Sequence, residues 1–424
     1  MTRSSASRAA FPWLVVVGVL VAALSLRGPI VAPTPVLRDI EHDLNIGAST
    51  AGLLTTAPVL MFALLTPIAA LVIRRAGVEI ALLITLLGVL VGTAIRALPG
   101  FPAMLTGMIV IGAAITIGNV VIPVVIRRDV PPERVGVVTA SYAATLNVGS
   151  LITSLLTAPL ADVIGWNLAL VAWSVLTIAG VVVWGAHLRR ERRRPPAVTV
   201  GRTAPRAGAA GIDPETITGP LPVVAPASSS VFRRPVTWLL LAAFALQVTI
   251  YYALSTWLPT IGADRLGLDA ATAGALASIF QGVGILGSFL VPLLARVAPR
   301  IVPTLVICAC WLLLTGGMLA APELTWLWLS FGAIAHSGGF VAIFSALVGV
   351  ARSDAEATTM SALVQGGGYG IGAFGAPIAG ALHEITGGWD AALWGMLGLA
   401  VLYAVALTSA MAVAARSKAD PSPH

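Results

Sequence analysis

Arg27 is the residue whose position most constrains what this chain can do. It lies deep inside a long apolar run, residues 11–36, where a charged side chain is costly and usually functional. All 18 acidic residues fall at the ends of apolar runs or between them, so no deep carboxylate is available to pair with this guanidinium. We therefore expect Arg27 to bind an anionic or strongly polar substrate in a wet cavity. A clamp on backbone carbonyls and snorkelling to the surface are the alternatives.

His336 is a second titratable side chain in the middle of an apolar run, residues 324–349. It is either a hydrogen-bonded core residue or a substrate ligand that can also carry a proton. Arg96, at the outer end of another run, is either an interfacial residue or a second cationic contact near the outer mouth. Amide and hydroxyl side chains at similar depth predict further contacts to a substrate or to another helix: Asn119, Gln247, Tyr251, Gln365 and Tyr369.

The sequence contains no catalytic or cofactor-binding constellation. There is no metal-ligand cluster, no Walker-type phosphate loop and no nucleophile with a base at usable depth. The two cysteines, Cys308 and Cys310, share one apolar run and are interpreted as packing residues. We therefore expect no enzyme activity, no cofactor and no metal. Without an ATP site, any transport would be facilitated or driven by an ion gradient.

The elements that must position these residues are membrane spans. Of 424 residues, 58% are apolar and 10% are charged, whereas soluble domains have about 45–50% and about 25%. The lipid bilayer must therefore be the solvent, and a span needs about 20 mostly apolar residues. Twelve runs qualify, which predicts an all-α integral membrane protein: 11–36, 50–73, 79–97, 102–126, 135–158, 166–187, 236–258, 270–295, 301–321, 324–349, 357–382 and 390–413.

The basic residues predict the orientation. Of the 25 Lys and Arg residues, 21 fall in the tails and loops of one side, whereas the other side has only Arg38 and Arg265. The positive-inside rule places the larger group, and with it both termini, in the cytoplasm. We expect the protein to lie in the cell membrane. The net charge of +7 does not indicate nucleic-acid binding, because the arginines form short clusters between apolar runs.

An internal repeat divides the spans into two sets of six. Leu44–Leu54 (LNIGASTAGLL) aligns with Leu266–Leu276 (LGLDAATAGAL) at a constant offset, and each string leads into the second span of its set. The segment between the sets is rich in Pro, Ala, Gly and Ser, which predicts a cytoplasmic linker. The expected domains are a first half, a linker, a second half and a cytoplasmic tail: residues 1–187, 188–235, 236–413 and 414–424.

Several strings resemble the cyanate and nitroimidazole transporter family of the major facilitator superfamily. The resemblance implies a twelve-helix fold in two pseudo-symmetric halves, whose spans 1, 4, 7 and 10 line a central cavity. It also implies small, often anionic or polar planar solutes, and it carries Arg27 and Asn119 over as site residues. The strings are Leu26-Arg27-Gly28-Pro29, Gly118-Asn119-Val120-Val121-Ile122-Pro123 with Arg127-Arg128-Asp129, Tyr252-Ala253-Leu254-Ser255-Thr256-Trp257-Leu258-Pro259, Gly366-Gly367-Gly368-Tyr369 and Thr386-Gly387-Gly388-Trp389.

One loop departs from the pattern of many facilitators. Where those carry an Asp that helps to latch the inner gate, this chain has Arg74, which argues against a typical proton-driven drug exporter. We predict a monomeric secondary transporter that moves a small anion or polar organic solute by alternating access, with His336 as the candidate for proton coupling. A proton-coupled multidrug exporter is the alternative, and a non-transporting membrane receptor or enzyme is the least supported interpretation.

Overall fold

The computed structural model describes residues 12–193, 231–299, 301–352 and 354–419, so most of the predicted linker, residues 194–230, lies outside the described residues. The first half consists of α1 (Trp13–Val31), η1 (Thr34–Val36), α2 (Leu37–Leu44), α3 (Ala48–Ala76), α4 (Val78–Arg96), α5 (Phe101–Asp129), α6 (Pro132–Ile164), α7 (Trp166–Ala172) and α8 (Ser174–Arg193). The second half consists of η3 (Val231–Arg233), α9 (Pro235–Leu266), α10 (Ala270–Val297), α11 (Ile301–Ala320), η4 (Pro322–Leu324), α12 (Thr325–Val350), α13 (Asp354–Gly372), α14 (Gly375–Thr386) and α15 (Asp390–Ala419).

The predicted all-α membrane fold is confirmed. Eleven segments of the described chain are long and apolar enough to cross a membrane. The remaining predicted span, residues 357–382, is divided between α13 and α14. The division follows a glycine-rich stretch, residues 366–372. Glycine is required on both sides of it, because a Cβ at Gly372 would overlap Val248 of α9 and one at Gly375 would overlap the carbonyl oxygen of Thr249.

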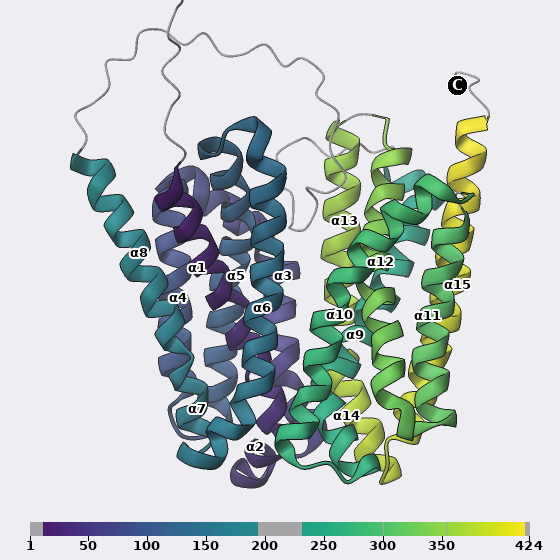
Figure 1. Ribbon diagram of the computed structural model, residues 1–424, viewed down its shortest axis with the longest axis horizontal. Helices are drawn as coiled ribbons and strands as arrows, with labels where there is room; N and C mark the ends of the chain where they lie inside the picture. Colours follow the sequence, from purple (N-terminus) through teal and green to yellow (C-terminus); the bar gives the residue numbers. More distant parts are fainter. Residues whose placement is uncertain (1–11, 194–230, 300, 353, 420–424) are drawn as a thin grey trace, which may run out of the picture.

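Two bundles stand side by side in Figure 1, α1 to α8 forming one and α9 to α15 the other. They contact each other mainly where α6 packs on α10 and where α3 packs on α13 and α14. The start of α1 and the last turns of α15 lie at the same end of the molecule. The first and last described helices therefore begin and finish at one end of the bundle, as expected for the twelve predicted spans.

The ribbons of the two bundles converge at the end that carries α2 and α14, and they separate toward the end where α15 finishes (Figure 1). We call the first of these the closed end. Helices meet there at backbone distance, since a Cβ at Gly52 of α3 would lie 2.9 Å from the nitrogen of Pro377 of α14. The contact is reinforced by an ion pair between Arg38 of α2 and Asp264 of α9. This conformation therefore joins the halves at the side that the charge pattern predicts to be outer.

Candidate functional site

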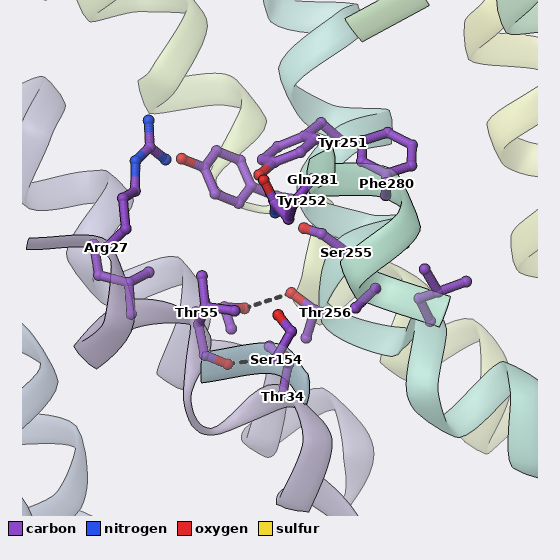
Figure 2. A pocket seen from close by; sticks show the side chains of 14 residues that line it. Arg27, Thr34, Thr55, Ser154, Tyr251, Tyr252, Ser255, Thr256, Phe280 and Gln281 are labelled. Atoms are coloured by element: carbon purple, nitrogen blue, oxygen red, sulfur yellow. Dashed lines mark hydrogen bonds between the residues drawn. The ribbon is translucent and has the colours of Figure 1, made fainter. Parts of the chain in front are cut away.

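A cavity lies between the two halves beside Arg27 (Figure 2). It encloses about 30 Å³, which is room for one or two water molecules. A larger solute would therefore enter only if the surrounding helices moved apart. The polar side chains that line the cavity come from α1, η1, α3, α6, α9 and α10: Arg27, Thr34, Thr55, Ser154, Tyr251, Tyr252, Ser255, Thr256 and Gln281.

Arg27 extends from α1 toward the tyrosines of α9 (Figure 2). Four of the five tyrosines in the chain lie close enough to act on it electrostatically: Tyr142, Tyr251, Tyr252 and Tyr369. None of the ion pairs in the described part of the chain includes Arg27, and no carboxylate lines this cavity. A cation surrounded by neutral hydroxyl groups and aromatic rings is suited to an anion or a strongly dipolar molecule, which would supply the missing negative charge.

Tyr251 is held in place by partners on two other helices. Its ring stacks on that of His336 of α12, with centroids 3.8 Å apart and planes at 8°. Its hydroxyl accepts a hydrogen bond from Nε2 of Gln281 of α10, at 3.2 Å. Gln247, one turn before Tyr251 and fully buried, donates from Nε2 to the carbonyl oxygen of His336 at 3.0 Å. His336 and Gln247 thus support the wall of the cavity from behind.

The other predicted site residues are distributed less tightly. Tyr369 of α13 packs edge-on against Phe244, with centroids 5.3 Å apart. Gln365 is buried and donates to the hydroxyl of Ser361 at 2.9 Å, within the same helix. Asn119 is partly exposed on α5, and it is not among the residues that line the cavity. Of the predicted residues, the structure therefore brings Arg27 and Tyr251 to the cavity itself, with Tyr369 nearby.

Arg96 lies elsewhere, inside the first half. Only 2% of it is exposed. Its guanidinium donates to the carbonyl oxygen of Pro29 at 2.7 Å and to that of Leu170 at 2.9 Å. This arginine, at the end of α4, thus joins α1 to α7 within one bundle.

The sequence prediction omitted several hydroxyl residues of the cavity. Thr256 of α9 donates to Oγ1 of Thr55 of α3 at 2.9 Å, which links the two halves beneath Arg27 (Figure 2). The spacing in the sequence could have indicated two of them. Ser255 and Thr256 follow Tyr251 and Tyr252 by four residues, so they share a helix face with the two tyrosines.

Comparisons with known proteins agree with this geometry. Residues 15–372 match the profile of the Major Facilitator Superfamily. The chain is 29% identical to the 2-nitroimidazole transporter of Escherichia coli strain K12, over 92% of this chain and 94% of that protein. It is 24% identical to the cyanate transport protein CynX of the same strain, over 86% and 89% of the two chains. A bacterial homologue of the human lysosomal transporter Spinster, solved in an inward-facing conformation, has the same fold with a TM-score of 0.71, 16% identity and coverage of 98% and 100%.

Proposed function

Because this chain belongs to the major facilitator superfamily and is a transporter, we propose that it moves a small anionic or polar solute, similar to cyanate or a nitroimidazole, by alternating access between its halves. The observation that carries the proposal is Arg27, a cation without a carboxylate partner in the described chain, beside a cavity at the boundary of the halves. A guanidinium offers five N–H donors in a planar fork, which fits a linear anion or a nitro group. Two relatives named for transport of 2-nitroimidazole and cyanate support this solute class.

We also propose that the transporter works as a monomer in the cell membrane with its closed end outside. The uneven distribution of Lys and Arg supports that orientation. In the present conformation the cavity would then be sealed from the outside by the contacts between α3 and α14 and by the ion pair of Arg38 with Asp264. A solute would exchange with the cytoplasm from this side once the helices around the cavity of about 30 Å³ have moved apart, and with the outside after the closed end has separated.

Uptake by purified protein in liposomes tests the proposed solute. Labelled cyanate, other small monovalent anions and 2-nitroimidazole are offered in parallel, with empty liposomes as the background. We expect at least one of these compounds to be transported, and to raise the apparent melting temperature of the detergent-purified protein, because a ligand that binds only the folded state stabilises it. If none is transported and expressing cells instead resist cationic drugs, the exporter alternative replaces this proposal.

We further propose that His336 carries any proton that is coupled to transport. It is a titratable group next to the cavity wall and in contact with Tyr251. It is also close enough to Arg27 for the charge of the guanidinium to act on it. We expect any pH dependence of uptake to be lost in His336→Gln and in His336→Phe. The Phe variant keeps an aromatic ring against Tyr251, so it separates loss of titration from loss of stacking. A pH profile identical to that of the wild type in both variants would exclude His336 from coupling.

A further inference from the structure

The two halves cap equivalent helices in different ways. In the second half, Asp269 is the N-cap of α10 and accepts hydrogen bonds from the backbone nitrogen of Thr272 at 3.0 Å and from its hydroxyl at 2.6 Å. These bonds hold the pKa of the Asp269 carboxyl below its usual value. In the repeat, the position equivalent to Asp269 is Gly47, the N-cap of α3. Glycine has no side chain with which to cap the helix.

A carboxylate from the opposite half takes over this task. Glu384, near the end of α14, accepts a hydrogen bond through Oε1 from the backbone nitrogen of Ser49 at 2.8 Å. The same oxygen occupies the space of the missing side chain, because a Cβ at Gly47 would overlap it. Helix α3 is therefore capped by a residue of the other half, whereas its counterpart α10 is capped by a residue of its own half.

We propose that Glu384 is a conformational latch that stabilises the closed end by capping α3 from the other half. The proposal rests on alternating access, in which the halves separate at this end. Separation leaves α3 without its cap, while α10 keeps Asp269 in both states. The capping carboxylate at α3 thus favours one conformation, and the equivalent carboxylate at α10 favours neither. Glu41 of α2 lies close enough to Glu384 for the two carboxylates to repel each other. Burial raises the pKa of the Glu41 carboxyl to about 7, Arg38 opposes this rise, and Glu384 adds to it.

Distances between spin labels at the closed end test the latch. Labels replace His42 in the first half and Glu323 in the second, both exposed, in a chain whose buried Cys308 and Cys310 are changed to alanine. Pulsed electron paramagnetic resonance of the protein in lipid nanodiscs then gives the ratio of long to short distances. We expect Glu384→Ala to raise this ratio about five-fold, which corresponds to the typical contribution of one cap, about 1 kcal/mol.

Asp269→Ala is the matched control. It removes one capping carboxylate from the equivalent helix, so it lowers stability in the same way, but the ratio of distances is expected to remain that of the labelled parent. Gly47→Asp supplies a cap within α3 while excluding Glu384 from its place, and it is expected to raise the ratio as Glu384→Ala does. The latch is overturned if Glu384→Ala leaves the distances unchanged, or if Asp269→Ala shifts them equally.

These measurements need no substrate, so they separate this proposal from the proposed solute. A shift in Glu384→Ala alongside a failure to transport any tested compound would retain the latch and reject the solute. Glu384→Gln covers the case in which the alanine variant does not fold. Its amide oxygen can still accept from Ser49 without the negative charge, so we expect a shift in the same direction but smaller.

Discussion

Arg27→Gln is expected to reduce the affinity for an anionic substrate by about ten- to hundred-fold. A hydrogen bond to a charged group contributes roughly 1.5–3 kcal/mol, and each 1.4 kcal/mol is about a tenfold change in affinity. The substitution should not destabilise the protein, because Arg27 has no ion pair to lose in the described structure and its charge is costly to hold inside a membrane. Initial uptake rates over a range of substrate concentrations, together with apparent melting temperatures, measure both effects.

Arg27→Lys provides the matched comparison. Lysine retains the positive charge but loses the planar fork of donors, so we expect it to retain part of the affinity for an anion. For an uncharged nitroimidazole, the loss in Arg27→Gln should be smaller than for an anion, because only hydrogen bonds are removed. Uptake rates equal to those of the wild type in both variants, with every transported compound, would contradict a substrate contact at Arg27.

The membrane spans were predictable because the bilayer imposes a simple rule on the sequence. Backbone groups inside lipid must be satisfied within a helix, and the helix must be apolar over about 20 residues. Interruptions of the helices were harder to predict from the sequence. The division between α13 and α14 was indicated by a cluster of glycines, whereas the one at Trp173, between α7 and α8, carries no comparable signal. Helix α2 was not predicted as a separate element, since its polar residues read as a loop.

The lining of the cavity in the candidate site was predicted in part, and the reason is energetic. Arg27 and Tyr251 stand out because polar groups of their size are costly in a membrane unless they have a partner. Threonine is different, because its hydroxyl can bond to a carbonyl of its own helix, as Thr55 does to Gly52 at 3.0 Å. Its presence in a span therefore does not indicate a cavity. The pairing of Thr55 with Thr256 depends on how the halves meet, which neither half encodes alone.

Arg96→Met is expected to lower the stability of the protein and to leave substrate affinity close to that of the wild type, which is the opposite of the effect expected for Arg27→Gln. Arg96 donates hydrogen bonds to two carbonyl oxygens that lack a hydrogen-bond donor in their own helices. The oxygen of Pro29 would bond to the nitrogen of residue 33, but that residue is Pro33 and has no N–H. Leu170 lies in the last turn of α7, where carbonyls lack helical partners. Losing these charged hydrogen bonds inside the bundle should cost on the order of 3 kcal/mol and lower the apparent melting temperature.

A second substitution can restore one of the lost partners. Pro33 has backbone angles in the helical region, so Pro33→Ala would place an N–H where it can reach the oxygen of Pro29. We expect Arg96→Met to cost less in the Pro33→Ala background than in the wild type, and the difference in a double-mutant cycle isolates that carbonyl from the one of Leu170. Substrate affinity per folded molecule should stay close to that of the wild type, because Arg96 does not line the cavity. A large loss of affinity with an unchanged melting temperature would instead make Arg96 a substrate contact, as its position near the outer end of a span first suggested.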